Sequence, residues 1–127
     1  MKNIMLIILL LTTTFAYAQD KKTFEGVWES EDINVYEFKD DVVYFCYYLK
    51  KLNTFFLYKG TFTYTDKHIT FHYTESGVHL NGTFYMSPHN DTVTYLYYLD
   101  KDTFNISQFG INHEQHDPEK LEVFRKQ

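Results

Sequence analysis

Cysteine is nearly absent from this sequence, which has only Cys46. A single cysteine excludes an internal disulfide, so the packing of side chains must supply the stability of the fold. Cys46 lies in the apolar run 42–48, where a cysteine usually behaves as a small buried hydrophobic residue. We therefore expect a structural role for Cys46 rather than a reactive thiol.

Basic residues and long apolar runs are also scarce. The chain has 12 lysines and arginines against 17 acidic residues, which gives a formal net charge of −5. Nucleic acids and anionic membrane surfaces select basic patches, so this charge argues against both as partners. No apolar run reaches the roughly 20 residues that a membrane-spanning helix needs, and the sequence predicts no transmembrane segment.

Motifs of known enzymes are missing as well. The sequence contains no Gly-x-Ser-x-Gly, no glycine-rich phosphate loop and no His-Glu-x-x-His, and Cys46 has no evident histidine partner. Glu29 and Glu31 form a carboxylate pair that would suit acid–base chemistry, but solvated surface is the simpler interpretation. We predict a protein that is not an enzyme and that needs no cofactor.

The N-terminus has the pattern of a cleavable secretory signal peptide. Lys2 precedes an apolar run at residues 4–11, and Ala16-Tyr17-Ala18 matches the Ala-x-Ala site of signal peptidase. We expect cleavage of residues 1–18 just before Gln19, and export of residues 19–127 as one domain to the periplasm or beyond. The alternative is a retained membrane anchor, for which the apolar run is short.

Most of the remaining chain alternates polar and apolar residues, a period that is typical of strands with one buried face. In residues 68–74, for example, Ile69, Phe71 and Tyr73 share one face. No segment shows a convincing helical stripe. The pattern predicts nine strands, at residues 24–29, 33–38, 42–50, 54–64, 68–74, 79–86, 92–99, 103–109 and 121–125. Polar turns are predicted between them, including turns at residues 75–77 and 87–91.

Eight or nine short strands joined by tight turns predict an all-β fold built as an antiparallel meander. A meander of this length avoids unpaired edges by closing into a small barrel. A flattened barrel and a two-sheet sandwich are the alternatives, because spacing in the sequence does not separate these architectures.

The first and last predicted strands resemble those of lipocalins and related calycin barrels. Gly26-Val27-Trp28 matches the Gly-x-Trp signature of that family, and Arg125 matches the arginine that packs over the signature tryptophan. With its signal sequence and the segment Lys59-Gly60-Thr61-Phe62, the chain is similar to small exported lipocalin-like domains of Bacteroidetes. The resemblance implies a lipocalin-like barrel in residues 19–127. Its structural signature residues would be Gly26, Trp28 and Arg125, with a cation–π contact of about 1 kcal/mol.

Aromatic residues are the most distinctive feature of the composition, with 12 Phe, 12 Tyr and one Trp. A cavity lined by tyrosines is apolar in body and has hydroxyls that orient a ligand, and the resemblance to lipocalins implies a ligand inside the barrel. We predict that the protein binds a small hydrophobic or aromatic ligand. The candidate lining residues are Tyr44, Tyr58, Phe62, Phe71, Phe84 and Tyr95.

The alternative prediction is a barrel filled by its own aromatic side chains. Such a protein would be an interaction domain, and an exposed strand face would bind another protein or the cell envelope. A small-ligand binder and a solid interaction domain differ in whether the barrel interior is hollow.

Histidines raise the question of a metal site. His68 and His72 lie about 13 Å apart along a strand, too far to bind one ion, although His72 and His79 could face each other across a hairpin. His113 and His116 would share one face of a helical turn, with acidic residues nearby. A solvated loop is the simpler interpretation, so we predict no metal site and keep His113 and His116 as weak candidates.

Overall fold

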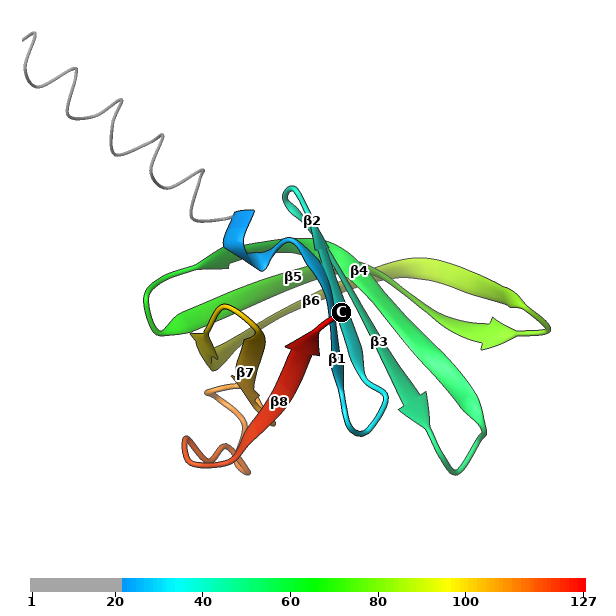
Figure 1. The fold of residues 1–127 in the computed structure, drawn as a ribbon. Coiled ribbons are helices and arrows are strands. Elements are labelled where there is room, and N and C mark those ends of the chain that lie inside the picture. The colour runs from blue at the N-terminus through cyan, green and yellow to red at the C-terminus, as the bar shows by residue number, and fades with distance from the viewer. Residues whose placement is uncertain (1–21) are drawn as a thin grey trace, which may run out of the picture.

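The computed structural model describes residues 22–127 and shows an eight-stranded antiparallel meander closed into a barrel (Figure 1). A short 3-10 helix, η1 (Lys22–Phe24), precedes the first strand. The strands are β1 (Gly26–Ser30), β2 (Val35–Lys39), β3 (Val42–Leu49), β4 (Thr54–Tyr64), β5 (His68–Leu80), β6 (Thr83–Leu99), β7 (Thr103–Ser107) and β8 (Leu121–Lys126). Each strand pairs with the next, and β8 returns to pair with β1. The predicted all-β meander barrel is confirmed.

The predicted signal peptide, residues 1–18, lies outside the described residues. Across residues 22–127, the structure contains no helix that is both long and apolar enough to cross a membrane.

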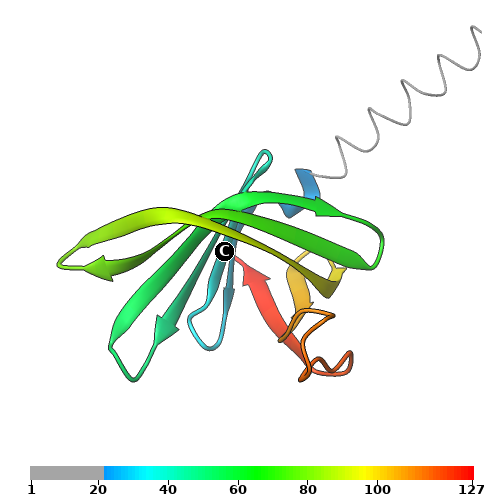
Figure 2. The same cartoon turned by 180° about the vertical axis from the view of Figure 1, so that it is seen from behind.

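The predicted turns at residues 75–77 and 87–91 are wrong, because both segments lie inside the long strands β5 and β6. A bulge shifts the β5–β6 register between Tyr73 and Glu75, and this changes the phase of the alternation at the place where a turn was expected. The hairpin instead turns at Asn81 and Gly82, whose φ angles of 51° and 85° suit an Asn-Gly turn. The β5–β6 hairpin projects far from η1 (Figure 2).

Aromatic side chains fill the end of the barrel next to η1, which we call the closed end. Phe24 of η1 is 1% exposed, and its ring centroid lies 5.0–6.1 Å from those of five other aromatic residues. The Trp28 indole Nε1 donates a 2.8 Å hydrogen bond to the Phe24 carbonyl, which holds η1 over the barrel. The other fully buried aromatic residues are Phe38, Phe62, Phe71, Phe104 and Phe124. The closed end is solid.

The expected contact between Arg125 and Trp28 is not present, and Lys126 takes that place. The Lys126 Nζ lies 5.5 Å from the centroid of the Trp28 ring, and Trp28 is paired with Lys126 in the β1–β8 register. Because Phe124 points into the core and side chains alternate along a strand, Arg125 points outward and is exposed. A basic side chain over Trp28 was anticipated, but it comes from Lys126, one residue after the expected Arg125.

Candidate ligand-binding site

The barrel is open where β6 and β7 separate. Although β6 begins at Thr83, β7 pairs only with residues 97–99 of that strand. The segment that follows β7 returns to β6, and the Ile111 amide donates a 2.8 Å hydrogen bond to the Thr94 carbonyl. A cavity of about 490 Å³ lies between the middle of β6 and this segment. We call this region the open end.

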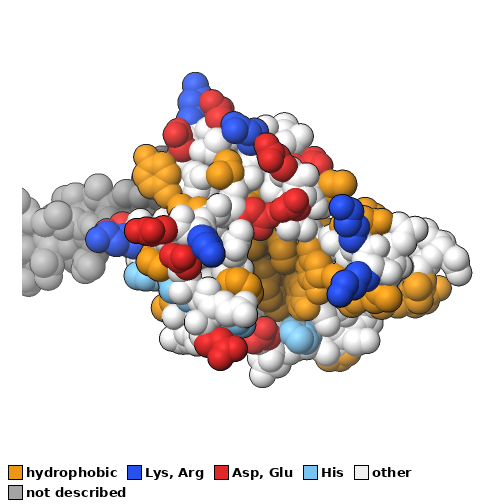
Figure 3. All heavy atoms as spheres, turned by 90° about the horizontal axis from the view of Figure 1, so that it is seen from below, with side chains coloured by type: hydrophobic (Ala, Val, Ile, Leu, Met, Phe, Trp, Pro, Cys, Tyr) orange, Lys and Arg blue, Asp and Glu red, His pale blue; other side chains and the backbone are white. Residues whose placement is uncertain are grey.

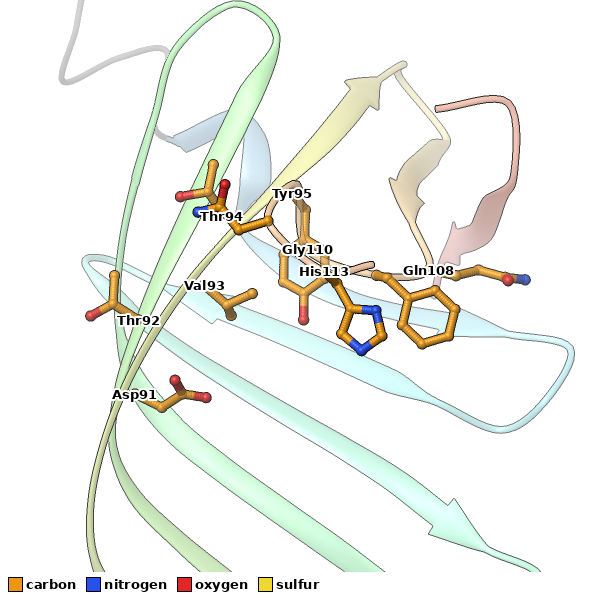
Figure 4. Close-up of a pocket in the computed structure, with 10 residues that line it drawn as sticks. Asp91, Thr92, Val93, Thr94, Tyr95, Gln108, Gly110 and His113 are labelled. Atoms are coloured by element: carbon orange, nitrogen blue, oxygen red, sulfur yellow. The ribbon is translucent and has the colours of Figure 1, made fainter. Parts of the chain in front are cut away.

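The cavity has one wall from β6 and one from the segment after β7 (Figure 4). Asp91, Val93 and Tyr95 extend from the same face of β6, and their partners on β5 are buried core residues. That alternation directs these three side chains into the barrel. The full set of lining residues is Asp91, Thr92, Val93, Thr94, Tyr95, Gln108, Phe109, Gly110, Asn112 and His113.

The second wall is held by local contacts. The Phe109 and His113 rings stack with centroids 4.6 Å apart, and His116 Nδ1 lies 3.0 Å from the Phe109 carbonyl oxygen. Gly110 packs so closely on Val93 that a Cβ at position 110 would lie 2.7 Å from Val93 Cγ2. Only glycine fits there without a shift of the valine or the loop, so the loop lies directly against β6.

Tyrosine hydroxyls line the interior between the core and the open end. Tyr36 and Tyr73 both stack on Phe71, with ring centroids 5.4 and 5.6 Å from that of the phenylalanine. Burial is the main reason that the pKa values of Tyr36 and Tyr73 lie well above their ordinary value. Burial, followed by the charge of Asp91, raises the pKa of Tyr95 to about 12. These phenols are neutral at physiological pH and supply hydrogen bonds on otherwise apolar walls.

Two carboxylates lie beside this set of hydroxyls. Asp91 is the β5–β6 partner of Tyr73 and lines the cavity with Tyr95, and its charge adds to the effect of burial in raising the pKa values of both tyrosines. Glu122 of β8 acts in the same way on Tyr36 and accepts a 2.9 Å hydrogen bond from Asn34 Nδ2. Glu122 alternates with inward-facing Phe124, so it also faces the interior.

A histidine side chain extends the aromatic surface away from the cavity. The His89 ring lies 5.6 Å from the ring of Tyr58, and its Nε2 atom is buried without a hydrogen-bond partner in the part of the chain that the structure describes. A buried polar atom without a partner is unusual and is a natural place for a ligand or a water to bind. Viewed from below, the molecule shows a hollow with an apolar surface (Figure 3).

The six predicted lining residues divide into an inner and an outer group. Tyr95 lines the cavity, half-buried Tyr58 contacts Tyr73 and His89, and Phe62 and Phe71 lie in the solid core. The other two, Tyr44 and Phe84, lie outside the barrel interior. The Lys59 Nζ atom lies 5.7 Å from the centroid of the Tyr44 ring, and Phe84 lies near the hairpin tip beside His79.

The lining residues predicted from sequence did not include buried Tyr36 and Tyr73, half-buried Glu122 or Asp91, which is exposed in the cavity wall. Tyr73 carried a usable signal, because it shares the alternation of Ile69 and Phe71. Asp91 carried none, because it was assigned to a turn that the structure does not contain. Its inward direction depends on the bulge in the β5–β6 pair.

The histidine candidates have other partners. His113 stacks on Phe109, and His72 Nδ1 lies 2.7 Å from Thr92 Oγ1. The His79 ring contacts Phe84. Within residues 22–127, the structure brings together no group of three His, Cys, Asp or Glu side chains that could hold a metal ion.

Comparisons with protein-family models, with curated proteins and with solved structures gave no match for this chain. The resemblance to lipocalins therefore stays a prediction from sequence, and the geometry of the open end is the basis for the function proposed next.

Proposed function

We propose that this protein binds a small molecule with an apolar or aromatic body at the open end of its barrel, as a non-enzymatic protein exported through its predicted signal peptide. The observation that carries the proposal is the contrast between the two ends. Aromatic rings plug the closed end, whereas a cavity of about 490 Å³ with Val93, Tyr95 and Phe109 in its walls occupies the open end.

The size of this cavity suits such a ligand, because small-molecule sites usually have volumes of about 300–1,000 Å³. Val93, Tyr95 and Phe109 supply apolar surface for its body. The rest of the lining is polar and supplies groups that could orient the ligand, among them the Asp91 carboxylate and the Tyr95 hydroxyl.

The test is binding of the neutral fluorescent probe N-phenyl-1-naphthylamine to the exported protein. Val93→Trp fills the cavity with a larger side chain, and we expect it to weaken probe binding at least tenfold. Tyr44→Ala removes an aromatic ring from the outer face and serves as the matched control, with unchanged binding expected. Equal binding by all three proteins, or no binding by the native protein, would contradict the proposal.

A second candidate function is recognition of another protein, and the tip of the β5–β6 hairpin favours it. Leu80 and Tyr85 are 53% and 58% exposed there, and exposed apolar patches mark interaction sites. A photo-crosslinking residue at position 85 should then give one discrete adduct in the exporting cell. The control is position 98, where the tyrosine is 64% exposed but lies outside the hairpin tip. Adducts of equal yield at both positions would exclude a specific surface at the tip.

A further inference from the structure

The charge at the open end is negative and has no local counter-charge. The cavity lining includes Asp91 and contains neither lysine nor arginine. Neither Asp91 nor Glu122 forms an ion pair with a lysine or arginine of residues 22–127. Lys59, which shares β4 with Tyr58, points outward and pairs with Glu75 at 3.8 Å.

Asp91 lies beside the tyrosines of the barrel interior. It is the β5–β6 partner of buried Tyr73, and it lines the cavity together with Tyr95. The Asp91 side chain extends from the same face of β6 as the Tyr95 side chain, toward His113 (Figure 4). A group in the cavity therefore has both a carboxylate without a basic partner and the aromatic side chains Tyr95 and Phe109 within its walls.

Tyrosine rings and carboxylates together favour cations over neutral or anionic groups. The face of an aromatic ring attracts a positive charge, and a carboxylate accepts strong hydrogen bonds from an ammonium group. A bound anion would instead face Asp91 without a basic side chain to offset the repulsion. An uncharged ligand would gain no charge-assisted hydrogen bond from Asp91, whose carboxylate is exposed and stays solvated.

We propose that the ligand is a cationic amphiphile of the arylalkylamine type, with its ammonium group held by Asp91 and with its apolar body against Val93, Tyr95 and Phe109. This inference rests on the proposed function and names the chemical class of the ligand. The net negative charge of the whole chain also favours a cationic ligand, because it attracts cations to the protein surface.

The experiment compares three probes that share one body: 4-phenylbutylamine, 4-phenylbutan-1-ol and 4-phenylbutanoate. Each probe displaces N-phenyl-1-naphthylamine from the exported protein at pH 7 and low ionic strength. We expect the amine to bind at least tenfold more tightly than the alcohol, and the carboxylate to bind most weakly. Higher salt should reduce the preference for the amine.

Variants assign that preference to particular residues. Asp91→Asn should reduce the advantage of the amine over the alcohol to threefold or less, with the affinity for the alcohol unchanged. Glu37→Gln removes the same charge from an exposed position on β2 and should leave the advantage intact.

Failures of the two proposals are distinguishable. If the alcohol or the carboxylate binds as tightly as the amine, the cationic ligand class is overturned and the apolar site stands. An advantage of the amine that survives Asp91→Asn overturns the assignment to this carboxylate. If neither the probes nor N-phenyl-1-naphthylamine bind, the site itself is overturned.

Discussion

Gly60 on β4 lies so close to His72 on β5 that a Cβ atom at position 60 would be 1.9 Å from the His72 carbonyl oxygen. The approach occurs where the register of β4 and β5 shifts, between Lys59 and Gly60. A glycine at a bulge lets two backbones come together and lets the strand bend. Gly60 therefore permits the close approach of β4 and β5 at this bulge.

Replacing Gly60 by alanine should cost about 3 kcal/mol or more of the free energy of unfolding, because two backbones would have to move apart. Gly82→Ala is the matched control. Its φ of 85° makes alanine strained by about 1 kcal/mol, but a Cβ there would meet no atom within 4 Å. Urea unfolding of both variants measures the difference in their free energies of unfolding. Equal losses would show that β4 and β5 can move apart at Gly60 without an additional cost.

Lys126→Ala should lower the free energy of unfolding by about 0.5–1 kcal/mol, since it removes the ammonium group over Trp28. Arg125→Ala should change it by less than about 0.5 kcal/mol, because that side chain is exposed. Parallel urea titrations followed by Trp28 fluorescence compare the two. A larger loss for Arg125→Ala would restore the contact expected from the lipocalin signature.

Phe24→Ala should cost about 3–5 kcal/mol, because it removes the ring that plugs the closed end. Tyr98→Ala deletes a 64% exposed ring and should cost less than about 0.5 kcal/mol. Thermal or urea unfolding of both proteins tests this. Should Phe24→Ala fail to fold, Phe24→Leu provides an intermediate loss. A negligible loss with leucine and alanine alike would mean that η1 is not part of the core.

Alkaline pH should destabilise the fold through its buried tyrosines. The pKa of Tyr95 is raised from 10.0 to about 12, so above pH 10 the unfolded state releases a proton that the folded state retains. The stabilisation is therefore complete below pH 10 and is lost as the pH rises through about 12. Tyr36 and Tyr73, whose pKa values are also raised, add to this slope.

Urea unfolding at pH 9, 10 and 11 measures that dependence, and Tyr95→Phe should make it shallower. Tyr98→Phe is the control at an exposed position and should leave the slope unchanged. A native protein whose stability does not fall between pH 10 and 11 would contradict the buried, neutral state of these phenols.

Cys46 should react slowly with a disulfide reagent in the folded protein and rapidly in urea. The side chain is half-buried, and burial raises the pKa of its thiol, so the reactive thiolate is scarcer in the folded state. The absorbance change with 5,5′-dithiobis(2-nitrobenzoate) follows the reaction. Equal rates with and without urea would show a freely accessible thiol.

Local patterns in the sequence determined much of this fold. Alternation placed Ile69, Phe71 and Tyr73 on one apolar face, and all three are buried in the barrel. Period-two alternation is a property of neighbouring residues in any extended chain, so it needs no knowledge of partners. The same local information includes the Asn81-Gly82 turn, although the turn was assigned elsewhere.

Tertiary structure alone decided the candidate site and the residue that covers Trp28. The inward direction of Asp91 depends on a bulge, and the position of Lys126 depends on the register between the first and last strands. A shift of one residue moves a side chain to the opposite face, and that register is set by barrel closure rather than by local sequence. The open end likewise depends on strand pairing, because β7 pairs with β6 only at residues 97–99.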